Sequence, residues 1–147
     1  MRFEKEKYVE YDDIIGSIDI YDKKNGKPIE FKTLRAKSIA EPKSFHMEQL
    51  KYYMAILDAP LGEIIYQCLL QFESNPFVSF EISMTEEQRL DQLKKLTEEF
   101  NSLQQAVKLK DPSIARGVYS DGSMNWLCKD CPYLKKCELT QDAASSA

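Results

Sequence analysis

The sequence lacks the features that mark membrane-spanning, secreted and repeat proteins. Its 147 residues contain no run of about 18 apolar residues, which is the length that crosses a bilayer. The N-terminus, Met-Arg-Phe-Glu-Lys-Glu-Lys, carries no apolar signal segment, and the chain shows no internal repeat. The composition therefore predicts one globular domain, cytoplasmic and without a membrane partner.

Negative charge exceeds positive charge in the chain as a whole but not in every segment. The formal net charge of −4 argues against indiscriminate binding to nucleic acid. Between residues 23 and 51, however, eight basic residues stand against three acidic ones. The basic residues are Lys23, Lys24, Lys27, Lys32, Arg35, Lys37, Lys43 and Lys51, and the acidic residues are Glu30, Glu41 and Glu48. This segment suits a phosphate backbone, although charge alone favours a solvated face.

Three of the four cysteines of the chain are clustered. Cys128, Cys131 and Cys137 lie within ten residues, whereas Cys68 stands alone in an apolar run. In an intracellular chain such clustering indicates a metal or an iron–sulfur cluster before it indicates disulfides. Zinc is the competing occupant, because three thiolates and one outside ligand also make a tetrahedral site. Cys68 is expected to be a small buried apolar residue.

Hydrophobic periodicity and turn signals predict a mixed α/β (α+β) fold. Strands are expected over residues 8–11, 14–21, 29–34, 63–72 and 77–82, with the 63–72 strand buried on both faces. Asn25-Gly26 is expected to form a two-residue hairpin turn. Helices are expected over residues 44–57, capped by Ser44, and over 85–108, opened by a capping box of Thr85 and Gln88.

The same patterns predict how the chain is divided. The apolar stripe of the second helix is expected to belong to the core; it consists of Leu90, Leu93, Leu96, Phe100, Leu103 and Val107. Residues 1–112 are expected to form the core domain, residues 113–140 a cysteine-cluster segment, and residues 141–147 a disordered tail.

Two acids and a lysine are predicted to meet on one face of the hairpin. In a two-residue Asn25-Gly26 turn Asp19 lies opposite Lys32, and Glu30 lies two positions along the same strand. Paired carboxylates suit Mg²⁺ or Mn²⁺, and an adjacent lysine can orient or deprotonate a water. Acid, acid and lysine therefore indicate phosphodiester hydrolysis. The alternative is an exposed cross-strand salt bridge.

The first helix adds a polar stripe beside its apolar one. His46, Gln49 and Tyr53 recur at i, i+3 and i+7. Gln49 and Tyr53 can hydrogen-bond DNA phosphates or brace Lys32. The candidate substrate-binding residues are Lys43, His46, Gln49 and Tyr53, although a lone histidine is more often a surface or core-edge residue.

Three short motifs, in this order, resemble those of a nuclease family. They are Gly16-Ser17-Ile18-Asp19, Glu30-Phe31-Lys32-Thr33, and Gln49 with Tyr53. Together they are similar to the motifs of the RecB-type branch of the PD-(D/E)XK nuclease superfamily. With the cysteine cluster they resemble the iron–sulfur exonucleases of that branch, such as the CRISPR-associated RecB-like exonucleases and the AddB nuclease domain. The resemblance covers residues 14–57 and 126–137.

This resemblance implies a restriction-endonuclease-like core and a set of roles. Asp19, Glu30 and the main-chain carbonyl of Phe31 would bind Mg²⁺ or Mn²⁺, and Lys32 would activate water. Gln49 and Tyr53 match the QxxxY motif and complete the expected catalytic set. Cys128, Cys131 and Cys137 match three ligands of a [4Fe–4S] cluster.

The chain departs from the family pattern at its start. The family takes a fourth cysteine and a metal-binding histidine from an upstream helical part, and this sequence has neither before its first strand. The sequence is therefore expected to be either a fragment that lacks this part or a shortened relative.

The function expected from the resemblance is that of a metal-dependent DNA exonuclease. Its substrate would be single-stranded or frayed DNA ends, in recombination, repair or CRISPR adaptation. Its protein partners would be a CRISPR integrase or helicase–nuclease subunits. The alternatives are a catalytically incomplete DNA-binding or complex-forming module of the same fold, and a partner-binding domain with a structural zinc tail.

Overall fold

The computed structural model describes residues 1–111 and residue 114. The cysteine-cluster segment, the tail and residues Cys128, Cys131 and Cys137 lie outside the described residues, so the predictions for them remain predictions. The chain divides into two compact units, and the boundary follows Lys94. Among the described helices, none is long and apolar enough to cross a membrane.

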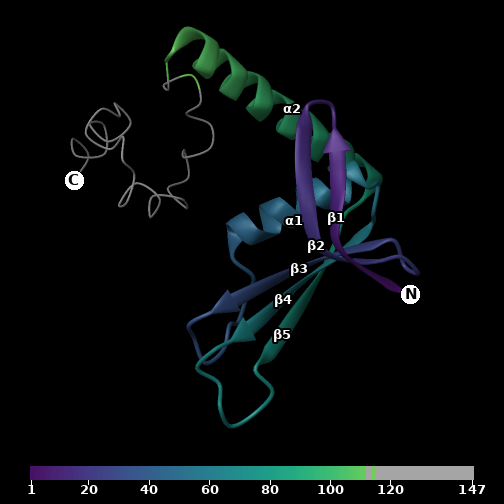
Figure 1. The fold of residues 1–147 in the computed structure, drawn as a ribbon, viewed down its shortest axis with the longest axis vertical. Helices are drawn as coiled ribbons and strands as arrows, with labels where there is room; N and C mark the ends of the chain where they lie inside the picture. Colours follow the sequence, from purple (N-terminus) through teal and green to yellow (C-terminus); the bar gives the residue numbers. More distant parts are fainter. Residues whose placement is uncertain (112–113, 115–147) are drawn as a thin grey trace, which may run out of the picture. The chain divides into compact units, whose positions relative to one another are not determined.

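The first unit contains one mixed sheet of five strands in the order β1-β2-β3-β4-β5 (Figure 1). The strands are β1 (Phe3–Tyr11), β2 (Ile14–Asp22), β3 (Lys27–Leu34), β4 (Leu61–Cys68) and β5 (Phe77–Ser83). Only β3 and β4 pair in parallel; the other neighbours are antiparallel. A parallel pair needs a crossover connection, and helix α1 (Ser44–Ile56) supplies it. The predicted fold class is confirmed.

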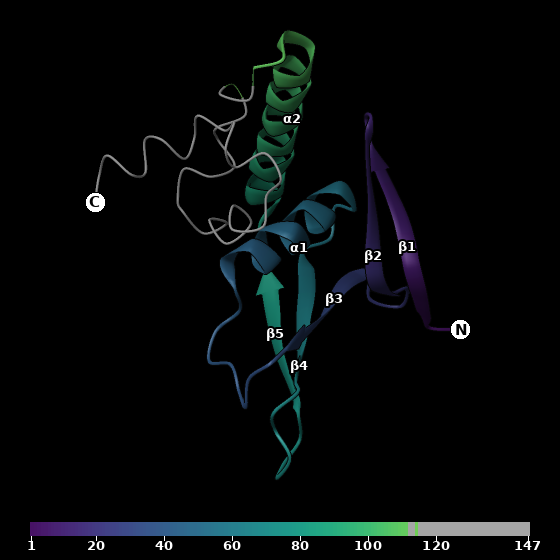
Figure 2. The same ribbon diagram turned by 60° about the vertical axis from the view of Figure 1, so that its left-hand side comes forward.

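Helix α1 covers one face of this sheet. Leu50 and Met54 of α1 are fully buried and pack in one cluster with Ile64 and Tyr66 of β4. On its other flank α1 contributes Tyr53 to a second cluster, with Val9 of β1 and Ile18 of β2. Figure 2 shows α1 beside both the β1–β2 hairpin and the β3–β5 strands. The helix is thus held in the angle between them.

The β2–β3 connection differs from the predicted two-residue turn. The observed pairs, Ile20 with Ile29 and Asp22 with Lys27, have numbers that sum to 49, and residues 23–26 form the connection. The cause is Asp22, whose carboxylate accepts hydrogen bonds from the Lys24 main-chain N–H (3.1 Å) and from Asn25 Nδ2 (2.7 Å). Such local bonds favour a wider turn. A register shift of two leaves every side chain on its predicted face.

Two further details of the predicted elements are wrong. Lys43, and not Ser44, is the N-cap residue of α1: its side chain makes no capping bond, and its carbonyl accepts the His46 and Met47 N–H groups. Strand β4 ends at Cys68, and its burial alternates, so only one face is fully buried. The alternation arises because α1 covers only one face of the sheet. Cys68 is 1% exposed, as predicted for a buried apolar residue.

Helix α2 spans Glu86–Leu109 and crosses the boundary between the two units. Its predicted capping box is confirmed, since Gln88 N–H donates to Thr85 Oγ1 (3.2 Å) and Thr85 N–H donates to Gln88 Oε1 (2.9 Å). The predicted core role of its stripe is wrong for Leu90, Leu103 and Val107, which are 61%, 53% and 71% exposed. The core over β4 is instead filled by α1.

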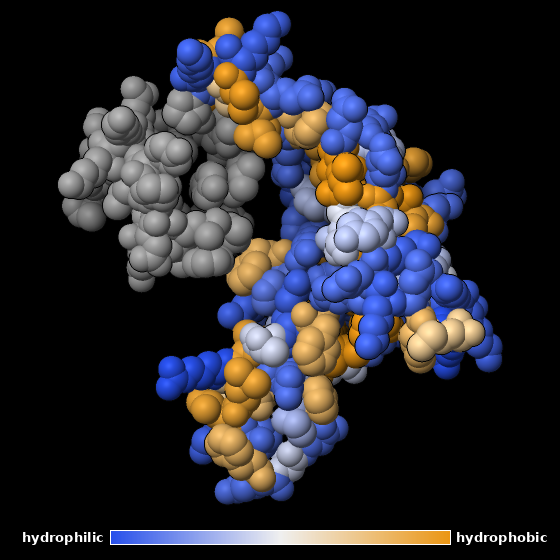
Figure 3. Space-filling view, in the orientation of Figure 1, coloured by the Kyte–Doolittle hydropathy of each residue, from blue (hydrophilic) through white to orange (hydrophobic). Residues whose placement is uncertain are grey.

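Exposed apolar residues gather where β4 connects to β5. Figure 3 shows orange residues at this end of the sheet, low in the view. The large apolar residues exposed there are Leu69, Leu70, Phe72 and Phe77.

Candidate active site

Glu30 and Lys32 are alternate residues of β3, so both side chains lie on the face that α1 covers. Their partners on β4 are Ile64 and Tyr66. Lys32 Nζ lies 2.7 Å from Glu30 Oε2 and donates a hydrogen bond to Gln49 Oε1 of α1 at 3.1 Å. Lys32 therefore links the sheet to the helix.

Asp19 lies near Glu30 at the point where the main-chain hydrogen bonds between β2 and β3 stop. Main-chain pairing of the two strands ends at Ile20 and Ile29. Beyond this point the N–H of Phe31 donates a hydrogen bond to Asp19 Oδ2 at 2.8 Å. The acceptor is thus a side-chain carboxylate of β2 instead of a main-chain carbonyl. In the observed register Asp19 lies across from Glu30, and its predicted position opposite Lys32 is wrong. The shared face is nevertheless retained.

Glu30 is the most unusual group in the first unit. Its side chain is fully buried, and neither carboxylate oxygen has a hydrogen-bond partner within the described structure. The Lys32 contact is short enough for an ion pair but lacks the angles of a hydrogen bond. Burial raises the pKa of Glu30, Lys32 opposes this shift, and the neighbouring charge of Asp19 adds to it.

Gln49 and Tyr53 extend the hydrogen-bonded chain from Lys32 back to β2. Gln49 Nε2 donates to the Tyr53 hydroxyl (3.3 Å), which donates to the main-chain carbonyl of Ser17 (2.9 Å). The ring of Tyr53 packs so closely on Gly16 that a larger residue does not fit there, because a Cβ at position 16 would lie 2.6 Å from Tyr53 Cε1. The GxxD and QxxxY motifs are therefore in direct contact.

His46 and Lys43 lie at the start of α1, beside Lys32. His46 Nδ1 is 2.9 Å from the hydroxyl of Tyr66, whose oxygen also accepts the Lys43 main-chain N–H at 3.1 Å. Burial, together with the charges of Lys32 and Lys43, lowers the pKa of His46 to about 4. The Lys43 side chain is exposed, with its ammonium 5.8 Å from the ring centroid of Phe45.

Sequence reasoning missed Tyr66. It lies in the apolar segment that contains Cys68, which the sequence predicts to be a strand buried on both faces. The available signal was its hydroxyl, because a buried tyrosine usually places that group against a hydrogen-bond partner. Its side chain is fully buried, and its position across from Lys32 puts it on the active face.

The donor set fits a hard divalent cation. Within the described residues no group of three or more His, Cys, Asp or Glu side chains is assembled. Two carboxylates, those of Asp19 and Glu30, lie close enough to interact electrostatically. Oxygen ligands of this kind suit Mg²⁺ or Mn²⁺, which usually retain several waters. The observation that favours such a ligand role is that the buried oxygens of Glu30 accept no hydrogen bond in the described structure.

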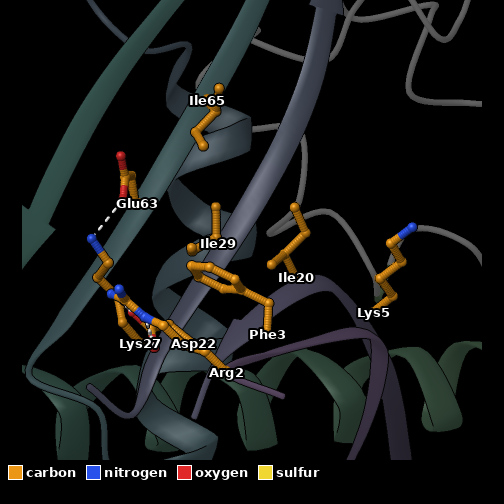
Figure 4. Close-up of a pocket in the computed structure, with 9 residues that line it drawn as sticks. All are labelled: Arg2, Phe3, Lys5, Ile20, Asp22, Lys27, Ile29, Glu63 and Ile65. Carbon is orange, nitrogen blue, oxygen red and sulfur yellow. Dashed lines mark hydrogen bonds and ion pairs between the residues drawn. The ribbon is translucent and has the colours of Figure 1, made fainter. Parts of the chain in front are cut away.

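A pocket of about 400 Å³ opens on the other face of the sheet (Figure 4). Ile20, Ile29 and Ile65 line its apolar part; four of its five charged groups form ion pairs, and the fifth, Lys5, is exposed. The pairs are Arg2 with Asp22 (2.5 Å) and Lys27 with Glu63 (2.5 Å). These satisfied ion pairs show no sign of a missing ligand, unlike Glu30.

Comparison with known proteins assigns a family to this geometry. The family model of the PD-(D/E)XK nuclease superfamily matches residues 1–138. The solved structure of SSO0001 is similar, with a TM-score of 0.52 and 19% identity, covering 92% of this chain and 59% of that chain. A phage-related exonuclease from Haemophilus somnus 129PT gives a TM-score of 0.45 and 16% identity, covering 63% and 55%.

The chain spans 59% and 55% of the lengths of these two solved structures. The likeness to SSO0001 concerns the fold alone. No curated protein matches the chain.

Proposed function

Because the chain belongs to the PD-(D/E)XK nuclease superfamily, we propose that it hydrolyses phosphodiester bonds in DNA with the help of a divalent cation. One observation carries this proposal: Glu30 is fully buried, neither of its carboxylate oxygens accepts a hydrogen bond in the described structure, and Lys32, its ion-pair partner, and Asp19 lie beside it. A purely structural ion pair would be expected to satisfy those oxygens. The substrate would be single-stranded or frayed DNA ends, and the activity that of an exonuclease.

The cation would be held by Asp19, Glu30 and the main-chain carbonyl of Phe31. Members of this superfamily typically use Mg²⁺ or Mn²⁺. When bound, the cation supplies Lewis-acid stabilisation of the negative charge that develops on the phosphate. The raised pKa of Glu30 is consistent with this role, because a nearby cation would favour the ionised carboxylate.

Lys32 would position the attacking water. An ammonium has three N–H donors; one is directed to Gln49 and one faces Glu30. The third is left for a water or a phosphate oxygen. The water oxygen forms the new bond to phosphorus while the bond to the leaving deoxyribose oxygen breaks. One proton passes from the water to solvent, and the leaving oxygen takes one up.

Gln49 and Tyr53 would fix the position of Lys32, and exposed cations would guide the DNA. Of the eight basic residues between 23 and 51, Lys23, Lys27 and Lys32 are held in ion pairs. Exposed cations remain in the segment that joins β3 to α1, namely Arg35, Lys37 and Lys43. This segment runs from the strand of Lys32 to the helix of His46. Phosphates along it would approach Lys43, His46, Gln49 and Tyr53.

The finer family assignment is also a proposal. We infer a RecB-type iron–sulfur exonuclease in which Cys128, Cys131 and Cys137 ligate a [4Fe–4S] cluster, acting in DNA recombination, repair or CRISPR adaptation. Anaerobically purified protein should then show a broad brown absorbance near about 400 nm. A colourless sample with about one zinc per chain would favour zinc.

A nuclease assay with Mn²⁺ and single-stranded or frayed DNA tests the activity. Asp19→Ala and Lys32→Ala should each lower the rate by about 10²-fold or more. Lys5→Ala is the matched control, because Lys5 is an exposed lysine on the pocket face of the sheet. A parent chain that cuts nothing would favour the complex-forming module, and variants as active as the parent would place the activity elsewhere.

A further inference from the structure

Tyr66 makes two polar contacts from a fully buried position. Its hydroxyl oxygen accepts the Lys43 main-chain N–H at 3.1 Å and lies 2.9 Å from His46 Nδ1. The ring centroids of Tyr66 and His46 are 5.5 Å apart, and the ring centroid of Phe45 lies 4.2 Å from that of His46 in an edge-to-face arrangement. Both aromatic neighbours limit the rotation of the histidine ring.

These contacts distinguish between the two neutral forms of His46. A phenol has one proton to donate. If His46 Nδ1 carried the proton, both contacts of Tyr66 would be acceptor contacts, and its own buried proton would be left without a partner among them. If Nδ1 is the acceptor, the phenol donates to it and every contact is satisfied. The proton of the neutral ring then resides on Nε2.

The surroundings keep this ring neutral. The ring is half-buried, and the charged groups that act on it are Lys32 from β3 and Lys43 from the residue before α1. Tyr66 faces it from β4, and burial raises the pKa of that phenol, so it remains protonated. A second positive charge next to Lys32 is therefore disfavoured at neutral pH.

We propose that Tyr66 is a positioning residue that holds His46 as the Nε2–H tautomer, so that the neutral ring donates a hydrogen bond to a phosphate oxygen of the DNA. The phosphate contact rests on the proposed nuclease function, whereas the tautomer does not. A neutral donor adds directionality to the site without repelling Lys32.

The tautomer is directly measurable because His46 is the single histidine of the chain. In ¹⁵N-labelled full-length protein at pH 7, the imidazole nitrogens should show a protonated Nε2 and an unprotonated Nδ1. Tyr66→Phe should shift the tautomer ratio several-fold toward Nδ1–H, as expected for the loss of one hydrogen bond. Tyr8→Phe, which removes an exposed hydroxyl, is the matched control. A protonated Nδ1 in the parent, or an unchanged ratio in Tyr66→Phe, would overturn the assignment.

The phosphate contact needs a second readout. A short oligothymidylate added in Ca²⁺ should move the His46 Nε2–H resonance, and Tyr66→Phe should weaken binding several-fold. His46→Gln offers an amide donor near the position of Nε2; in that background Tyr66→Phe should have no further effect on binding. Additive losses would instead indicate a purely structural tyrosine and overturn the positioning role.

The two parts fail separately. If the oligonucleotide does not bind at all, the phosphate contact and the proposed function are both wrong. The spectrum of the ligand-free protein still decides the tautomer. If the chain binds and cuts DNA while the His46 resonances stay fixed, the phosphate contact alone is wrong.

Discussion

Asp22 and Glu30 are two buried carboxylates at neighbouring places in one sheet, and their surroundings are opposite. Asp22 is 1% exposed and accepts hydrogen bonds from Arg2, Asn25 and the Lys24 N–H. The Arg2 guanidinium, helped by the other donors, holds its pKa well below the usual range. Asp22 is on the pocket face of the sheet and shapes the β2–β3 turn.

Glu30 is equally buried but poorly satisfied. Lys32 is its charged neighbour, both oxygens lack a hydrogen bond in the described structure, and burial raises its pKa. Burial of an acid therefore does not by itself indicate a functional site. The distinguishing feature is whether the lone pairs of the carboxylate have been given partners.

The largest expected effect comes from neutralising each acid in turn. Glu30→Gln should lower the rate of Mn²⁺-dependent DNA hydrolysis by more than about 100-fold, since even outer ligands of metal sites contribute about 10–100-fold. Asp22→Asn should keep the rate per folded molecule and lower the melting temperature, because its turn and its ion pair are lost. Rates and thermal melts of both variants check this. Equal losses of rate in the two folded variants would contradict the claim that Glu30, and not Asp22, takes part in hydrolysis.

Removing the basic side chain that pairs with each acid, Lys32 for Glu30 and Arg2 for Asp22, should also have different effects on the two sites. Lys32→Met should lower the rate by about 10²-fold and, above the folded-state pKa of Glu30, destabilise the fold by about 3 kcal/mol, because the buried carboxylate loses the cation that pairs with it. Arg2→Met should leave the rate unchanged, since Asp22 retains Asn25 and the Lys24 N–H. Urea unfolding and the nuclease assay measure the two effects. A Lys32→Met protein of parental stability at pH 8 would contradict the account of Glu30.

A smaller effect is expected from two glycines that contact α1. Gly16→Ala places a Cβ 2.6 Å from the Tyr53 ring, and we expect the rate to fall about 10-fold as the Tyr53–Gln49–Lys32 chain shifts. Gly62→Ala meets Met54 Sδ at 2.7 Å, which lies in the core, and should cost about 1–3 kcal/mol of stability without lowering the rate per folded molecule. Steady-state rates normalised to folded protein separate the two. The prediction is wrong if Gly62→Ala slows the reaction as much as Gly16→Ala.

The smallest effect is the pH dependence of stability, and it has opposite signs for the two acids. The folded-state pKa of Glu30 is raised, so its contribution is largest below the unfolded value of about 4.3 and is lost as pH rises toward the folded pKa. The folded-state pKa of Asp22 is lowered, so its contribution is present above about 3.9 and is lost as pH falls. Unfolding free energies should be measured from pH 2 to 8. As pH rises, the stability of the parent should fall relative to that of Glu30→Gln and should rise relative to that of Asp22→Asn. Parallel curves would mean that neither carboxylate is perturbed.

Local sequence signals predicted most of the sheet and the first helix, for identifiable reasons. Alternation placed Glu30 and Lys32 on one face, and this survived a register error because the shift was by two residues. The capping box of α2 depends only on Thr85 and Gln88, which are close in sequence, and its bonds are present as predicted.

Features decided by distant contacts could not be predicted in this way. The turn at residues 23–26 is set by the Asp22 side chain and not by Asn25-Gly26 alone. The partnership of Tyr66 with His46 joins β4 to the start of α1, which no spacing in the sequence reveals. The exposed stripe of α2 shows that helical periodicity of apolar residues does not establish burial. The catalytic roles of the residues around Glu30 remain predictions.

Binding of Mn²⁺ to the full-length chain tests the central claim most directly, because it requires no turnover. Electron paramagnetic resonance of free Mn²⁺ should show about one ion bound per parent chain, the same for Asp22→Asn, and a loss of at least about 10-fold in affinity for Glu30→Gln. Parental Mn²⁺ affinity in a folded Glu30→Gln protein would contradict the assignment of Glu30 as a metal ligand, and with it the proposed hydrolytic site.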